Sequence, residues 1–230
     1  MNSYQIYCLS FKNPTRKLEM ENRFKQLNLD YVFYDGVDLN DPRIQNNKNI
    51  GWSIMLGALD IIKKFYDSEK EFGIFCEDDV FIHKDLKIML PNIIEDFKLM
   101  NLDVLLLGYL IPFEIKSYYP NFELKSIDPT LNYVYHNYPD DLWGGQMFMF
   151  SKKHAKYLLE KYTIEYANKT LIDNTLPPFS GDFTLTKQGN RALIYPMLAV
   201  ETADKIYSDY GQNIFHKNCN KQNYDSNIYI

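Results

Sequence analysis

The sequence predicts an α/β fold with a mostly parallel central sheet flanked by helices, and three observations favour it. Strand-like and helix-like patterns alternate over segment 4–76, which is typical of a parallel sheet built from right-handed crossovers. Segments 72–76 and 104–107 are almost entirely apolar, as expected of strands that helices cover on both faces. A chain of 230 residues with 46% hydrophobic residues can bury one large core, so we expect a single domain over 1–230.

The first elements follow the order strand, helix, strand, helix. Segment 4–9 (Y-Q-I-Y-C-L) indicates a strand, and Pro14 suits the first turn of a helix that extends to about residue 29. Segment 31–34 indicates a second strand. The polar segment 38–49 has no periodicity and predicts a surface loop. Apolar residues then recur at helical spacing over 52–67, which predicts a helix that covers the sheet.

Three consecutive carboxylates, Glu77, Asp78 and Asp79, follow the apolar segment 72–76. Ligands of open α/β sheets bind at the carboxyl ends of the strands. Two unit charges about 4 Å apart repel by roughly 1 kcal/mol in water and by about 4 kcal/mol at an effective dielectric near 20. A hard divalent cation would remove this conflict, and a ligand diphosphate would complete its oxygen shell. If the strand continued, side-chain alternation would place Glu77 and Asp79 on one side and Asp78 on the other.

Beyond this cluster the pattern becomes less regular. Segment 86–100 fits a helical face that Pro91 interrupts, which predicts a short turn and then a helix that begins near Pro91. In 109–141, aromatic residues, prolines and short β-like pieces replace the alternation of strand and helix. We expect a small antiparallel ribbon in this segment, at which a second substrate is held.

Two adjacent glycines, Gly144 and Gly145, would let the backbone approach a ligand closely. They precede a strand expected at 147–150 and a helix capped by Ser151. Segment 181–188 suggests a short helix and segment 192–200 a last strand. The remaining segment 201–230 is polar and aromatic and has no clear periodicity.

Composition excludes several classes of protein. The net charge of −5 without a basic patch gives no reason to expect a nucleic-acid partner. The three cysteines lack metal-ligand spacing, which favours reduced thiols over a disulfide framework. No basic and apolar leader opens the chain, and no stretch approaches 18 consecutive apolar residues. We therefore expect no membrane span and a cytoplasmic location.

Several segments together resemble glycosyltransferase family 25, the lipooligosaccharide and collagen galactosyltransferases. They are a first strand leading to an Arg- and Lys-rich helix, E-D-D-V at 77–80, G-x-x-F-x-F-S-x-x-x-A-x-x-L-L within 144–159, D-x-x-L at 182–185 and Y-P at 195–196. The resemblance covers roughly residues 4–209. Family members commonly carry a Ser-His pair on the helix before the acidic strand, whereas this chain has G-W-S-I-M-L at 51–56, which leaves the donor sugar open.

The resemblance implies a GT-A type fold and transfer of a sugar from a nucleotide-sugar donor, a UDP-sugar, to a hydroxyl of a glycan or protein acceptor with inversion. It also implies Mn²⁺ or Mg²⁺, with Asp79, Glu77 and the late His216 as metal ligands. We expect 1–108 to be the nucleotide-binding half and 109–230 the acceptor-binding half. The residues expected at the donor are Ser10, Arg16, Glu77, Asp78, Asp79, Gly144 and Gly145.

Sugar transfer also needs a base that takes the proton of the acceptor hydroxyl. Asp182 is our candidate, because it follows a Pro-rich loop beside Gly181 at the start of a short helix. The helix macrodipole alone would also favour an acidic residue there, so both interpretations stay open. Asp173, in L-I-D-N-T-L, is the reserve candidate.

Two other functions remain open. A metal-dependent phosphohydrolase would also use carboxylates at a strand end, although no nucleophile with evident partners accompanies them. The other is a non-catalytic module that binds nucleotide sugars, to which the missing Ser-His pair gives weight.

Overall fold

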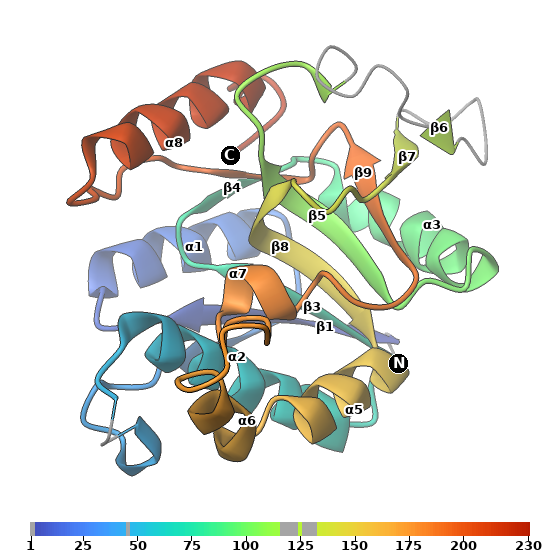
Figure 1. The fold of residues 1–230 in the computed structure, drawn as a ribbon. Coiled ribbons are helices and arrows are strands. Elements are labelled where there is room, and N and C mark those ends of the chain that lie inside the picture. The colour runs from blue at the N-terminus through green and yellow to red at the C-terminus, as the bar shows by residue number, and fades with distance from the viewer. Residues whose placement is uncertain (1–2, 45–46, 116–123, 126–132) are drawn as a thin grey trace.

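A mixed eight-stranded sheet runs through the protein in the order β2-β1-β3-β8-β5-β9-β7-β6 (Figure 1). The structure is a computed structural model that describes residues 3–44, 47–115, 124–125 and 133–230, with the backbone alone at 124, 125, 182 and 183. The strands are β1 (Tyr4–Ser10), β2 (Tyr31–Asp35), β3 (Phe72–Glu77), β5 (Val104–Leu110), β6 (Leu124–Lys125), β7 (Val134–Asn137), β8 (Trp143–Ser151) and β9 (Arg191–Tyr195).

Strand directions confirm the predicted sheet. β1 pairs in parallel with both β2 and β3, and β5 pairs in parallel with β9. β8 lies between β3 and β5 and is antiparallel to both. The antiparallel ribbon expected within 109–141 is the pair β6 and β7, and β7 joins the sheet antiparallel to β9. The parts of that segment at 116–123 and 126–132 lie outside the described residues.

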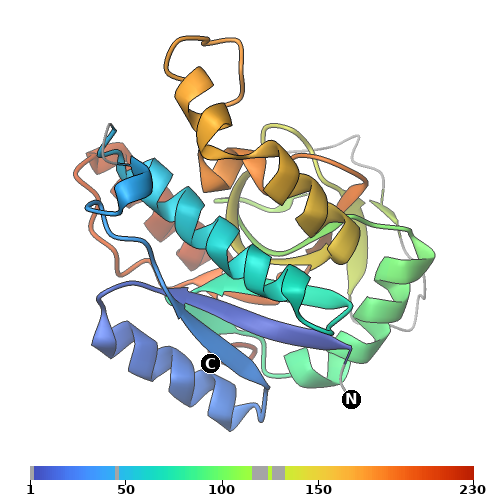
Figure 2. The same ribbon diagram turned by 90° about the horizontal axis from the view of Figure 1, so that it is seen from below.

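Helices cover both faces of the sheet, as Figures 1 and 2 show. They are α1 (Pro14–Gln26), η1 (Pro42–Ile44), α2 (Ile50–Asp67), α3 (Leu86–Leu99), α5 (Lys152–Lys161), α6 (Ile164–Lys169), α7 (Gly181–Thr184) and α8 (Tyr210–Asn223). Because side chains alternate along each strand, the buried residues form two hydrophobic clusters, one on each face of the sheet. Tyr7 and Phe75 pack in a cluster with α2 and α5, whereas Ile6 and Ile74 pack with α1 and α3. No helix in the described segments is long and apolar enough to cross a membrane.

Two expectations about elements after the acidic cluster are wrong. The expected start near Pro91 is wrong, because α3 begins at Leu86 and contains Pro91; Leu86 and Leu90 are fully buried, and this packing offsets the hydrogen bond that Pro91 cannot donate. Segment 192–200 forms two strands, because Pro196, which has no N–H, separates β9 from β10 (Ala199–Glu201).

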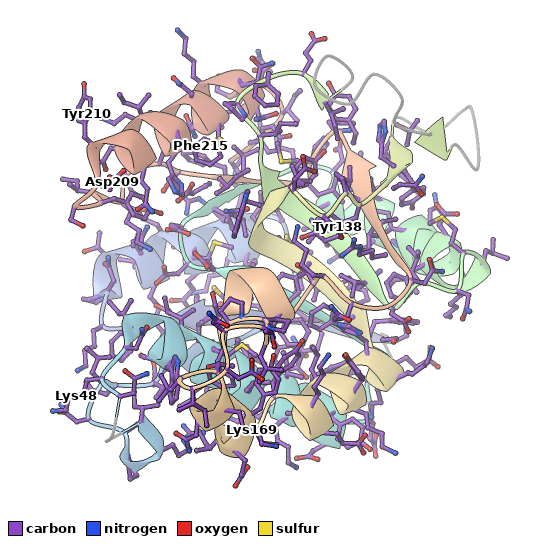
Figure 3. All side chains as sticks on the ribbon, in the orientation of Figure 1. Lys48, Tyr138, Lys169, Asp209, Tyr210 and Phe215 are labelled. Carbon is purple, nitrogen blue, oxygen red and sulfur yellow. The ribbon has the colours of Figure 1, made fainter. Side chains whose placement is uncertain are left out.

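The segment without periodicity, 201–230, contains the helix α8. Cys219 is its one buried residue, so the helix shows no apolar stripe that periodicity could detect. Its start is fixed locally, since the side chain of Asp209 accepts a hydrogen bond from the backbone N–H of Gln212 at 2.7 Å. Figure 3 shows Asp209 and Tyr210 together at this end of the helix.

A second, two-stranded sheet joins distant parts of the chain. β4 (Val80–Ile82) directly follows the acidic cluster and pairs antiparallel with β10. The backbone N–H of Thr202 also donates to the carbonyl of Asp79 at 2.7 Å. The acidic cluster and the segment after β10 are therefore held side by side.

Candidate functional site

The carboxyl ends of β1 and β3 place two of the expected donor residues in contact. Ser10 is the last residue of β1, and Asp78 follows β3 directly. The hydroxyl of Ser10 donates to Oδ2 of Asp78 at 2.6 Å, and both residues are buried. This contact follows from the parallel register, which aligns the two strands at this edge of the sheet.

Arg16 bridges three carboxylates at the same edge. Its guanidinium binds Oδ2 of Asp79 and lies 3.6 Å from Oδ1 of Asp78 and 3.3 Å from Oδ1 of Asp204. Asn13 caps α1 by accepting from the backbone N–H of Arg16, and Pro14 follows as the first helical residue. The start of α1 thus directs Arg16 toward the acidic cluster.

The three carboxylates of the acidic cluster lie on different sides from those that strand alternation would give. β3 ends at Glu77, so the period of two does not extend through Asp79, and Asp78 and Asp79 both contact Arg16. Glu77 instead lines a pocket on the α2 side of the sheet together with Phe75. The condition for the expected separation of Asp78 from Asp79, a strand that continues through Asp79, is therefore not met.

Asp79 carries the least satisfied oxygen of the site. Its side chain is 2% exposed, and its Oδ1 has no hydrogen-bond partner among the described residues. A buried carboxylate oxygen without a partner is costly, so a ligand at this position would relieve the cost.

A second group of side chains adjoins Asp79 from β10 and α8. Nδ1 of His216 lies 2.5 Å from Oε2 of Glu201, whose side chain is 5% exposed. The Tyr207 hydroxyl donates to Oε1 of Glu201 at 3.3 Å, and its ring stacks on that of His216. Burial raises the pKa of Glu201, the hydrogen bond and charge of His216 oppose this, and the charge of Asp79 raises the pKa further.

Sequence reasoning identified His216 but missed Glu201, Asp204 and Tyr207. The signal for Glu201 was present, because it is an acidic residue at the end of the apolar segment 192–200, just as Glu77 ends 72–76. Asp204 and Tyr207 lie in an irregular segment. Their contacts with Arg16 and Glu201 depend on the pairing of β4 with β10.

The carboxylate oxygens of this site fit a hard divalent cation. Asp78, Asp79 and Asp204 share a single guanidinium, and the buried Glu201 adds further negative charge nearby. The free Oδ1 of Asp79 is the type of ligand that Mg²⁺ and Mn²⁺ prefer. Within the described ranges, no three or more His, Cys, Asp or Glu side chains are already grouped as a metal site.

Gly144 and Gly145 lie at the start of β8. Gly144 has φ +98°, and a Cβ there would lie 2.6 Å from Oε1 of Gln146 and 2.9 Å from the backbone nitrogen of Leu110. The fold itself therefore requires Gly144. Gly145 lines the same pocket as Glu77.

Two hollows adjoin α7. The apolar pocket, a cavity of about 50 Å³, lies between α2, α7 and the sheet. The polar groove, of about 490 Å³, lies between the start of α2 and the segment that joins α6 to α7. Ser180 lines the groove and Gly181 lines the pocket, so the first turn of α7 separates them.

The two candidate bases occupy different places. Asp182 belongs to α7, directly after the residues that border the two hollows; its side chain is not among those described. Asp173 is exposed and accepts hydrogen bonds from the backbone N–H and hydroxyl of Thr175, at 3.0 and 2.6 Å. These bonds to Thr175 lower the pKa of Asp173.

Comparisons with known proteins identify distant structural similarity alone. No family model matches the chain, and no curated protein sequence does either. The structure is similar to a glycosyltransferase involved in glycosylation of the major capsid of PBCV-1, with a TM-score of 0.39 and 11% identity, covering 83% of this chain and 81% of that one. It is also similar to HddC from Yersinia pseudotuberculosis, with a TM-score of 0.38 and 13% identity, covering 94% and 78%.

The charge of Asp78 is expected to make stability depend on pH. Burial raises its pKa from 3.8 although Ser10 and Arg16 act in the opposite direction. Because the folded state holds this proton more tightly than the unfolded state, stability falls as pH rises from 3.8 through the raised pKa. Asp78→Asn keeps the acceptor for Ser10 and should melt at a higher temperature than wild type at pH 7. Melting curves at pH 4 should show this difference shrinking; a constant difference would contradict the explanation.

Proposed function

We propose that this protein is a glycosyltransferase that moves a sugar from a nucleotide-sugar donor, a UDP-sugar, to an acceptor hydroxyl with inversion. The observation that carries the proposal is the convergence of Ser10, Arg16, Asp78 and Asp79 at the carboxyl ends of β1 and β3. This edge is where open α/β sheets bind ligands. A guanidinium and a cluster of carboxylates together suit a diphosphate bound with a divalent cation.

The negative charge of the site explains why a cation would be needed. A diphosphate would meet Asp78, Asp79 and Asp204, which share Arg16 as their counter-charge, and the nearby Glu201. Repulsion between these anions disfavours donor binding unless further positive charge is present. We propose Mn²⁺ or Mg²⁺ in this role, held by Oδ1 of Asp79 and by His216. Glu77, the further ligand expected from the sequence, lines the apolar pocket instead. When bound, the cation would stabilise negative charge on the leaving diphosphate as a Lewis acid.

The contacts of His216 support its proposed role. Oε2 of Glu201 accepts a hydrogen bond from Nδ1–H of His216, and the ring of Tyr207 stacks on the imidazole. These two contacts hold the imidazole in one orientation. Metal-ligating histidines commonly have their other ring nitrogen fixed by a carboxylate in this way. Glu201 is thus a positioning residue in the proposal.

The acceptor is proposed to bind in the polar groove. Its lining residues carry no charge and include amides and hydroxyls, which suit the hydroxyl groups of a glycan. They are Asn47, Asn49, Gly51, Trp52, Thr170, Leu171, Asn174, Leu176, Pro178, Phe179 and Ser180. We propose Asp182 as the base for the acceptor hydroxyl, because it lies in α7 just beyond Ser180.

Thermal denaturation tests the proposal. A UDP-sugar at about 100 times its Kd should stabilise the protein by about 2.7 kcal/mol, or roughly 5–10 °C, when Mn²⁺ is present. The same donor with a chelator should produce almost no shift, since Arg16 alone cannot offset the carboxylates. Absence of a metal-dependent shift across a panel of nucleotide sugars would refute the proposed donor site.

Donor hydrolysis then separates an enzyme from a binding module. Slow release of UDP from the stabilising donor, dependent on Mn²⁺, is expected of a transferase that lacks its acceptor. A full thermal shift without UDP release and without transfer to any glycan would favour the non-catalytic module.

A further inference from the structure

The apolar pocket opens at the same edge of the sheet as the proposed donor site. Its inner wall consists of buried side chains such as Tyr7, Ile62 and Phe75. The lining residues that reach the surface include Ile54, which is 44% exposed, together with Glu77 and Gly181. The mouth of the pocket therefore lies near the end of β3 and the start of α7.

The size of the pocket limits its ligand. About 10–15 Å³ admits one water-sized group, so a cavity of about 50 Å³ admits a substituent of a few heavy atoms but not a sugar ring. An apolar cavity of this kind holds water poorly, so a methyl group that enters it displaces little bound water. The interior thus favours a small, methyl-terminated substituent.

Glu77 defines the polar part of the mouth. It is the last residue of β3 and lies two positions after Phe75. Side chains two positions apart share a face of a strand, so both face the α2 side of the sheet. Asp78 and Asp79 contact Arg16 of α1. A carboxylate accepts hydrogen bonds and donates none, so its partner on a ligand carries an N–H or O–H group.

An acetamido group satisfies both requirements, because its amide N–H lies next to a methyl-terminated acyl group. We propose that the apolar pocket binds the acetamido substituent of an N-acetylhexosamine, with the methyl group inside and the amide N–H donating to Glu77. This inference rests on the proposed function, and it names the class of sugar that the site recognises. The sugar belongs either to the donor or to the acceptor, and the experiment distinguishes them.

Two binding assays, both with Mn²⁺, test whether the donor or the acceptor carries the acetamido group. The donor assay compares UDP-N-acetylglucosamine with UDP-glucose, and the acceptor assay compares methyl N-acetylglucosaminide with methyl glucoside in the presence of UDP. In one of them the acetamido compound should bind at least about tenfold more tightly, since a filled apolar pocket gives discrimination of this order.

Two variants that narrow the pocket test its location. A Cβ at Gly181 would lie 3.6 Å from Leu185 and 3.8 Å from Ile54, ordinary contacts that allow Gly181→Ala to fold. Ala58→Val narrows the pocket independently, because it adds two carbons to the wall that α2 contributes. Both should reduce the preference for the acetamido compound to about twofold or less, while binding of the matching glucose compound stays unchanged. Gly211→Ala, the same change at the start of α8 and outside the lining of the pocket, should keep the full preference.

Each outcome decides one proposal without the other. If UDP binds with Mn²⁺ but neither acetamido compound gains affinity, or if the gain persists in both pocket variants, the acetamido pocket is refuted and the proposed donor site stands. If no nucleotide binds but the methyl N-acetylglucosaminide does, and both pocket variants remove its advantage, the pocket stands and the proposed transferase is refuted. If no compound binds, both proposals are refuted.

Discussion

Asp79→Asn is expected to lower the rate of donor turnover by roughly 10²- to 10³-fold while the fold stays intact. A bound cation contributes several kcal/mol of charge stabilisation, and each 1.36 kcal/mol is about a factor of ten in rate. The amide oxygen of asparagine can still accept from Arg16, which also binds Asp78 and Asp204. Melting in the absence of metal should therefore change little, while the Mn²⁺-dependent shift given by a UDP-sugar should disappear.

Asp96→Asn is the matched control for this substitution. Asp96 is also a buried aspartate, at 6% exposure, but it lies on α3 and accepts from the hydroxyls of Tyr133 and Tyr135. The asparagine variant keeps an acceptor for these hydroxyls and should retain wild-type turnover. Wild-type turnover in Asp79→Asn, or equal losses in both variants, would show that Asp79 has no special role.

The sequence was most informative where burial and charge repulsion act locally. β3 and β5 could be predicted because strands covered on both faces need continuous apolar runs. The acidic cluster could be singled out because adjacent carboxylates need a counter-charge. Part of this charge comes from Arg16, which is expected at the donor from the sequence and which binds the carboxylates directly in this structure.

Features that depend on long-range pairing could not be predicted in the same way. β10 brings Glu201 beside the acidic cluster through its pairing with β4, and no local pattern specifies this partner. α8 buries Cys219 alone, so its hydrophobic pattern carries no helical signal. The apolar pocket is likewise assembled from β1, α2, β3, β8 and α7, and its existence depends on how these elements pack.

Asp182→Asn should slow sugar transfer by about 10²- to 10⁴-fold, the range that positioned general bases contribute. Donor binding should not change, because the proposed donor contacts lie at β1, α1 and β3, so the Mn²⁺-dependent thermal shift is the internal control. Asp173→Asn is the matched substitution in the same loop-to-helix region. Its amide oxygen can still accept from Thr175, so transfer should continue at close to the wild-type rate.

The pair of variants decides which aspartate is the base. The carboxylate of Asp173 is already used to hold the turn at Thr175, and these bonds lower its pKa and weaken it as a proton acceptor. Asp182 directly follows Ser180, which lines the groove proposed for the acceptor, and Gly181, which lines the pocket proposed for the acetamido group. If transfer by Asp182→Asn is undiminished while Asp173→Asn is inactive with an unchanged melting temperature, the base must be Asp173, and the acceptor must approach from the α6 side of the groove.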